Sequence, residues 1–133
     1  MKIQFLGILM FSLISSCQTT PSFDYSDFSE KRYISWEDMF LFDGCYYVYI
    51  FSKTCSHCEK IKQQVLAFLV KEDCFYLIEG NKDIPRTNHP EENIGETRME
   101  NVAILGYPTL FLLENKAIKQ VWTGEYEITS YII

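Results

Sequence analysis

The sequence has no cluster of Lys and Arg residues and no glycine-rich loop that could hold a phosphate group. It carries 12 basic and 18 acidic residues, which gives a net charge of −6 at pH 7. Nucleic-acid binding depends on basic surfaces, so these absences argue against a nucleic acid as a partner. Internal repeats and low-complexity segments are also missing, and nothing in the sequence indicates a repeat protein.

The composition that remains is typical of one globular domain. The chain has 133 residues, of which 47% are hydrophobic and 23% charged. This balance argues against disorder. Ten Phe, nine Tyr and two Trp residues are enough to build a small aromatic core.

The first residues have the layout of a secretion signal. Lys2 precedes an apolar run from Ile3 to Ile14, and small residues follow at 15 and 16. The run is shorter than the roughly 20 apolar residues that a membrane-spanning helix needs. We therefore expect a signal peptide over residues 1–16. The alternative is a short membrane anchor or a misassigned start.

The stretch LISSC, which ends at Cys17, resembles the bacterial lipobox, although Ile14 replaces the usual Leu. This resemblance implies that Cys17 carries a lipid and that the mature protein is anchored outside the cytoplasmic membrane. Secretion without an anchor is the alternative. We expect residues 17–31 to form the lipidated N-terminus and a polar tether, and residues 32–133 to form the folded domain.

The domain alternates strand and helix patterns. CYYVYIF (45–51) is short, apolar and β-branched, which indicates a buried strand, and apolar residues at helical spacing follow from Ser56. The other expected elements are a short strand at 32–34, a helix at 35–42 that starts with a capping box at Ser35, a strand at 74–79, a helix at about 90–101, a hairpin of 109–114 and 117–123, and a last helical piece at 128–133. This order predicts an α/β fold with a mixed sheet and helices on both faces.

Two cysteines in FSKTCSHCEK lie where the first long strand ends and the helix begins. A thiol at a helix N-terminus meets unpaired N–H groups and the positive end of the helix dipole, and both favour the thiolate. Cys55 is the more exposed position, so it is the expected nucleophile. Cys58, one turn later, is the expected resolving thiol. His57 adds a nearby charge or hydrogen-bond donor that tunes the pair.

The segments YIFSKTCSHCEKI and AILGYPTLFLLENKAIKQVWTG, with the strand–helix order between them, resemble the thioredoxin superfamily. The resemblance covers about residues 32–133 and implies a thioredoxin fold. It also implies a cis Tyr107–Pro108 bond that lies against the dithiol, with backbone near Tyr107 that pairs with an extended substrate. We expect Tyr107, Pro108 and Ser56 to contact the substrate.

Two departures from the family concern the chemistry. Tyr49 takes the strand position where reducing members carry a buried acidic residue. Ser56-His57 replaces the usual Gly-Pro between the cysteines. A histidine before the second cysteine is similar to the oxidase and isomerase branches, where it stabilises the thiolate and makes the disulfide more oxidising. These features favour an oxidase or isomerase over a reductase.

Cys45 and Cys74 each open a predicted strand. Two interpretations stay open for them: a structural disulfide, if their Cα atoms lie within about 7 Å, or two small buried apolar residues.

A zinc site is the competing interpretation of the CxxC segment. Zinc takes four ligands, and the sequence has no second CxxC or HxxxH pair. Cys74 and His89 are the only spare candidates, so we expect no metal and no other cofactor.

The sequence therefore predicts a membrane-tethered thiol–disulfide oxidoreductase. Its expected partners are exported protein thiols or disulfides and a dedicated redox partner. The alternative is a non-catalytic surface lipoprotein that uses the same fold as an interaction or accessory module.

Overall fold

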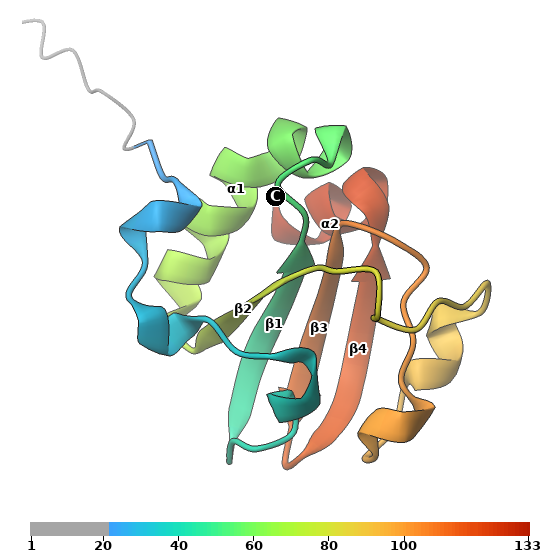
Figure 1. Cartoon of the computed structure of the whole chain (residues 1–133). Helices are drawn as coiled ribbons and strands as arrows, with labels where there is room; N and C mark the ends of the chain where they lie inside the picture. The colour runs from blue at the N-terminus through green and yellow to red at the C-terminus, as the bar shows by residue number, and fades with distance from the viewer. Residues whose placement is uncertain (1–21) are drawn as a thin grey trace, which may run out of the picture.

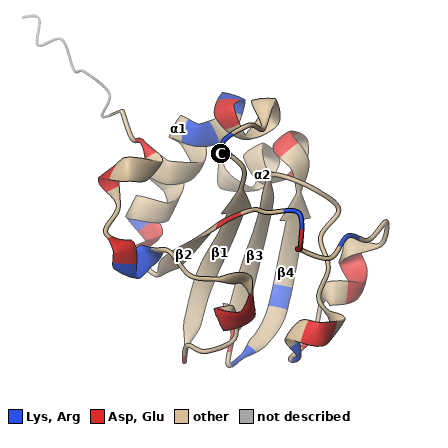
Figure 2. Cartoon of the chain, viewed as in Figure 1, with Lys and Arg blue, Asp and Glu red and all other residues tan. Residues whose placement is uncertain are grey.

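A computed structural model describes residues 22–133. The predicted signal peptide (1–16) and the predicted lipidation site Cys17 lie outside the described residues. Within the described part, no helix is both long and apolar enough to cross a membrane. Lys and Arg residues are scattered over the ribbon with acidic residues among them (Figure 2).

The centre of the molecule is a four-stranded mixed sheet with the strand order β2-β1-β3-β4 (Figure 1). Its strands are β1 (Cys45–Phe51), β2 (Phe75–Glu79), β3 (Thr109–Glu114) and β4 (Ala117–Thr123). β1 and β2 are parallel, and the remaining pairs are antiparallel. The β3–β4 turn places Asn115 and Lys116 at φ values of 51° and 61°, the left-handed conformation that tight hairpins require. The strands predicted at 45–51 and 74–79 and the predicted hairpin are confirmed.

Two α-helices cover one face of the sheet. Helix α1 (Ser56–Glu72) connects β1 to β2, and α2 (Gly124–Ile132) follows β4. The inward side of α1 carries Cys58, Ile61, Val65, Leu66 and Leu69. These residues pack with Tyr49 and Phe51 of β1, and with Ile128 of α2, in one buried cluster. The apolar period read from the sequence therefore identifies the buried side of α1.

The second face of the sheet has a core of its own, and none of residues 22–133 forms an α-helix over it. Trp36 and Met39 cover it from one side, and Ile84, Val102 and Ile104 from the other. The helix predicted at 90–101 is wrong. It is replaced by two 3₁₀ helices, η4 (Pro90–Asn93) and η5 (Met99–Asn101). Gly95 lies between them at φ +90°, outside the range of any right-handed helix.

Two other expectations at the start of the domain also fail. The predicted strand at 32–34 is a single bridge between Tyr33 and Leu77. The predicted helix at 35–42 is only the 3₁₀ turn η3 (Trp36–Asp38), and the Ser35 side chain makes no capping hydrogen bond. Beyond this turn, Met39 is buried in the second core, and the rings of Phe40 and Phe42 pack against that core while partly exposed.

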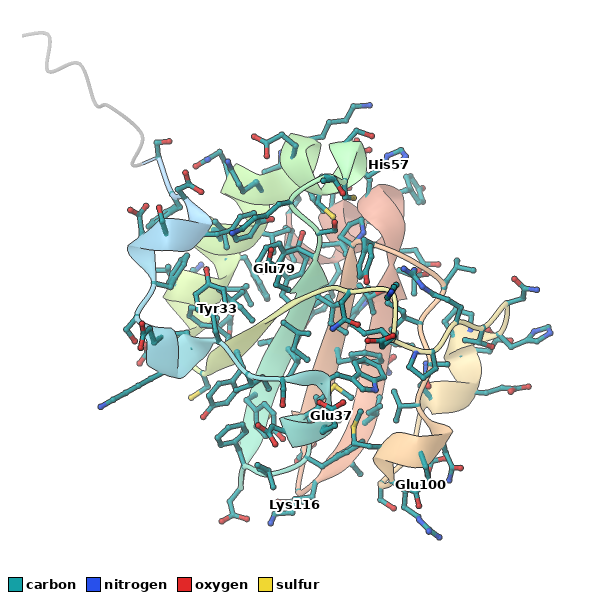
Figure 3. All side chains as sticks on the ribbon, viewed as in Figure 1. Tyr33, Glu37, His57, Glu79, Glu100 and Lys116 are labelled. Atoms are coloured by element: carbon teal, nitrogen blue, oxygen red, sulfur yellow. The ribbon has the colours of Figure 1, made fainter. Side chains whose placement is uncertain are left out.

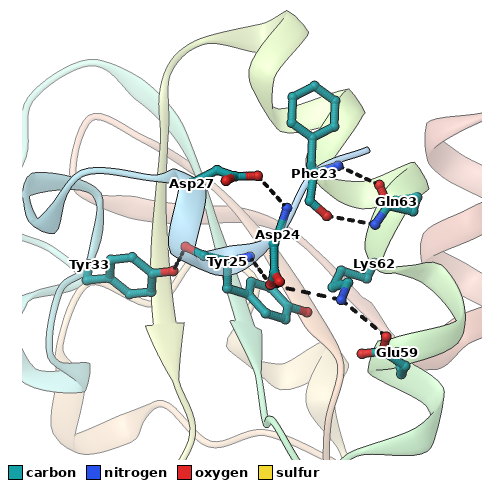
Figure 4. A network of polar contacts seen from close by, with 8 residues as sticks. All are labelled: Phe23, Asp24, Tyr25, Asp27, Tyr33, Glu59, Lys62 and Gln63. Carbon is teal, nitrogen blue, oxygen red and sulfur yellow. Dashed lines mark hydrogen bonds and ion pairs between the residues drawn. The ribbon is translucent and has the colours of Figure 1, made fainter. Parts of the chain in front are cut away.

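The segment predicted as a tether packs against the domain from Phe23 onward, so the predicted boundary between residues 31 and 32 is wrong. The 3₁₀ helices η1 (Tyr25–Asp27) and η2 (Glu30–Arg32) lie here. The side chain of Gln63 on α1 accepts the Phe23 N–H and donates to the Phe23 carbonyl, each at 2.7 Å (Figure 4). The ring of Tyr25 stacks on Phe51 with centroids 3.8 Å apart. The segment is polar in composition, but its aromatic side chains pack it against the core.

Candidate active site

The end of β1 and the start of α1 position the two cysteines. Cys55 is the N-cap residue of α1, and its sulfur accepts the backbone N–H of Cys58 at 3.1 Å. Cys55 is half-buried, whereas Cys58 is only 1% exposed and lies under the first turn. The predicted difference in exposure between the two thiols is confirmed. Only Cys55 can meet a large partner directly.

The buried thiol resists ionisation. Burial, and then the hydrogen bond with Cys55, raise the pKa of Cys58 to about 12, while a hydrogen bond with the backbone of Ser52 acts in the opposite direction. Cys58 is therefore a thiol near neutral pH, and it needs local stabilisation to become a nucleophile or a leaving group.

A second segment faces the cysteines. The Tyr107–Pro108 peptide bond is cis, as the family resemblance implies, and Pro108 lies just before β3. The Cys55 thiol donates to the Tyr107 carbonyl at 3.7 Å. Residues 52 positions apart thus meet at one site. The prediction that Cys55 lies beside the backbone of Tyr107 is confirmed.

Three contacts hold Tyr107 in place. The Arg86 guanidinium lies 4.5 Å from the centre of the Tyr107 ring, and the Tyr107 hydroxyl donates to the Asn81 carbonyl at 3.0 Å. Gly80 lies directly against the ring, because an added Cβ would fall 2.1 Å from a ring atom. The loop after β2 therefore fixes the position of the Tyr107 side chain.

His57 and Ser56 occupy the exposed first turn of α1. Figure 3 shows His57 at the end of the molecule where α1 begins. His57 Nδ1 lies 3.0 Å from Oε2 of Glu125, in the first turn of α2, and this contact lowers the pKa of Glu125. A cleft of about 470 Å³ opens between these helices and is lined by His57, Tyr107, Thr123, Gly124, Glu125 and Tyr126, among others.

The sequence did not identify three residues of this site: Gly80, Arg86 and Glu125. Glu125 is 68 positions from His57, and no motif links the two. Gly80 directly follows a predicted strand, where a glycine can mark close approach of another segment.

Cys45 and Cys74 do not behave as either interpretation predicts. All four cysteines in the described part are free thiols, and Cys45 and Cys74 are exposed. The bridge is therefore not formed in this structure, and the alternative of two buried residues is wrong. The β1–β2 register pairs Tyr47 with Phe75, which places Cys74 opposite Tyr46. Cys74 itself lies just before β2, and both cysteines line one small surface pocket at this end of the sheet without a bond between them.

Residues 22–133 contain no group of three or more His, Cys, Asp or Glu side chains that could hold a metal ion. His89, a spare candidate for the zinc alternative, is exposed, and its Nδ1 lies 3.4 Å from Oε1 of Glu91.

Replacing Gly80 with Ala should disturb Tyr107, because the new methyl group overlaps its ring. We expect Gly80→Ala to lower the free energy of unfolding by about 1–3 kcal/mol, the usual cost of overpacking. Gly106→Ala is the matched control, since its Cβ would meet only Arg86 at 3.5 Å. Urea unfolding measures both variants. Equal stability of the two would show that Tyr107 is not constrained by Gly80.

No protein-family model matches the sequence, and no curated protein matches it in sequence. Solved structures do match its fold. A chain in the crystal structure of the ferredoxin:thioredoxin reductase–thioredoxin f2 complex superposes with a TM-score of 0.52 and 16% identity, over 75% of this chain and 89% of that one.

Thioredoxin f2 of Chlamydomonas reinhardtii gives a TM-score of 0.48 and 16% identity over 75% of this chain and 91% of that one. Mitochondrial thioredoxin 3 of Saccharomyces cerevisiae gives 0.49 and 9% identity over the same shares. From the sheet order, the cis-proline and the first of these superpositions, the chain has the thioredoxin fold.

Proposed function

We propose that this protein is a thiol–disulfide oxidoreductase that exchanges disulfides with protein substrates through Cys55 and Cys58. One observation carries the proposal: the half-exposed sulfur of Cys55 caps α1, while Cys58 lies buried directly beneath it. The free backbone N–H groups of a helix N-terminus favour a sulfur anion at the Cys55 position.

The exchange proceeds in two steps. In the reducing direction, the Cys55 thiolate attacks a substrate disulfide, forms a mixed disulfide and releases one substrate thiolate. The Cys58 thiolate then attacks the Cys55 sulfur. A Cys55–Cys58 bond forms, the bond to the substrate breaks, and the substrate leaves with the electron pair and takes up a proton. The oxidising direction is the reverse of these steps.

Two features support oxidation or isomerisation over reduction. Tyr49, and not a carboxylate, lies in the buried cluster with Cys58. His57, next to Cys58 in sequence, is held by Glu125 at the mouth of the cleft. A protonated His57 would stabilise the reduced dithiol, which makes the disulfide a stronger oxidant.

The proposed location rests on the sequence of the first seventeen residues. A basic residue, a short apolar run and a cysteine after two serines support export and lipidation at Cys17. We place the domain outside the cytoplasmic membrane, where its substrates would be exported proteins or a dedicated redox partner and where disulfides persist.

Replacing Cys58 with Ala should trap substrates, because the mixed disulfide on Cys55 can no longer be resolved. We expect disulfide-linked complexes on non-reducing gels that a reductant releases. The double variant Cys55→Ala, Cys58→Ala should give none, and Cys74→Ala, which alters an exposed thiol elsewhere, should trap nothing. An empty trap would favour the alternative of a non-catalytic binding module.

The reduction potential of the Cys55–Cys58 pair should be well above the roughly −270 mV of reducing thioredoxins. Equilibration against glutathione buffers measures it. His57→Ala should make the potential more negative, since it removes a group that stabilises the reduced form, and His89→Ala is the exposed control. A wild-type value near that of reducing thioredoxins would contradict the preference for oxidation.

Mass spectrometry of the protein from membranes should identify Cys17 as the first residue and as lipid-modified. Cys17→Ser should move the protein out of the membrane fraction. An unmodified Cys17 inside a peptide that continues from the preceding residues would rule out the anchor.

A further inference from the structure

Two tyrosine hydroxyl groups are buried without hydrogen bonds. Tyr49 on β1 is 0% exposed and Tyr25 in η1 is 8% exposed. Among residues 22–133, neither hydroxyl has a hydrogen-bond partner. Buried polar groups are satisfied in the great majority of cases, so each exception calls for an explanation.

Both hydroxyl groups lie in the core around Cys58. Tyr25, Tyr49 and Cys58 belong to one buried cluster between β1 and α1. Tyr25 and Tyr49 each stack on Phe51, with ring centroids 3.8 Å and 6.1 Å from it. Figure 4 shows how the Tyr25 backbone is fixed, because the Tyr33 hydroxyl donates to the Tyr25 carbonyl.

The pKa values of the tyrosines reflect this proximity. Burial raises the pKa of both Tyr25 and Tyr49, and the charge of a Cys58 thiolate raises each of them further, by more than that of Cys55. The two hydroxyls also lie close enough to affect each other's pKa, although they do not form a hydrogen bond of good geometry. Cys58 lies inside the buried cluster that contains this pair, whereas Cys55 only packs against that cluster.

The other groups around the pair are few. Cys55 raises the pKa of Cys58 and the backbone of Ser52 lowers it, and a charge on Cys58 raises the pKa of Tyr107. Glu59 also raises the pKa of Tyr25, by less than Cys58 does. Lys62 lies 5.8 Å from the centre of the Tyr25 ring, where ion pairs with Glu59 and Asp24 hold it (Figure 4). No carboxylate is among the groups that shift the pKa of Cys58 in the described part.

We propose that the hydroxyl groups of Tyr25 and Tyr49 donate hydrogen bonds to the Cys58 thiolate during disulfide exchange, which makes both tyrosines positioning residues of the redox site. This inference rests on the proposed function. Within residues 22–133, neither hydroxyl has a hydrogen-bond partner of good geometry, so both are available when the sulfur becomes charged. A sulfur anion in an apolar core needs such donors, since solvent cannot reach it.

The inference holds for either direction of electron flow. When Cys58 resolves a mixed disulfide, it loses its proton, attacks the Cys55 sulfur and expels the substrate thiolate, which takes up a proton. When a substrate thiolate attacks Cys55 of the oxidised pair, the Cys55–Cys58 bond breaks and Cys58 leaves as the thiolate. Both steps pass through the same anion, and the hydroxyl groups stabilise it in both.

The test measures how fast Cys58 resolves a mixed disulfide. Cys17, Cys45 and Cys74 are replaced with Ser throughout, and a chromophoric aromatic disulfide loads Cys55 at acidic pH. A jump to higher pH starts release of the aromatic thiol. Losing one donor should reduce the thiolate population of Cys58 about tenfold. The rate of release should fall by less than tenfold, because a Cys58 thiolate with a higher pKa is a stronger nucleophile.

We therefore expect release to be about threefold slower in Tyr25→Phe and in Tyr49→Phe at each pH below the ionisation of Cys58, and slower still in the double variant. Tyr47→Phe is the matched control. It lies on the same strand, but its hydroxyl bonds to the Tyr131 hydroxyl at 2.6 Å, and it should release the thiol at the wild-type rate.

Urea unfolding separates this role from a structural one. Removing an unpaired buried hydroxyl should leave stability unchanged or raise it. Release at the wild-type rate in the Phe variants would overturn the inference, and so would slower release that comes with lost stability. Failure of the proposed function would look different, because the wild-type pair would then not release the aromatic thiol at all, and both proposals would fall.

Discussion

The site depends on one hydrogen bond at the start of α1, from the Cys58 backbone N–H to the Cys55 sulfur. The first turn of any helix has N–H groups without partners inside the helix, and here a thiol accepts one of them. The same turn buries Cys58 beneath Cys55, because the inward side of the helix begins at that position. The contrast between one accessible sulfur and one buried sulfur follows from the helical period, and disulfide exchange needs that contrast.

The opposite wall of the site comes from the loops that flank β2 and β3. Tyr107 contacts Gly80, Asn81 and Arg86, so the segment after β2 holds the residue that lies against Cys55. Parallel pairing of β1 with β2 brings both strand ends to the same edge of the sheet. The cysteines and the support of Tyr107 therefore meet at this edge because of the sheet topology, although they are far apart in the chain.

Local sequence patterns predicted the long strands, the first helix and the hairpin correctly. The apolar run at 45–51, the helical period after Ser56 and the hairpin around Asn115 each predicted their element, and the CxxC segment predicted the placement of Cys55 over Cys58. Patterns failed where long-range burial decides the conformation. The helix expected at 90–101 has helical composition apart from Gly95, yet the chain there follows the surface of the second core as two 3₁₀ turns. Glu125 reaches His57 only because α2 packs beside the start of α1, which no spacing in the sequence records.

The segment that begins at Phe23 contributes a side chain to the core around Cys58. Its composition is that of a polar linker, but Tyr25 puts its ring on Phe51 and its hydroxyl into the core that contains Cys58. Under the proposed hydrogen bond, docking of this segment and ionisation of Cys58 are linked equilibria, and the coupling free energy is the same in both directions. Any change that loosens the segment would then raise the pKa of Cys58, and formation of the thiolate would hold the segment more firmly.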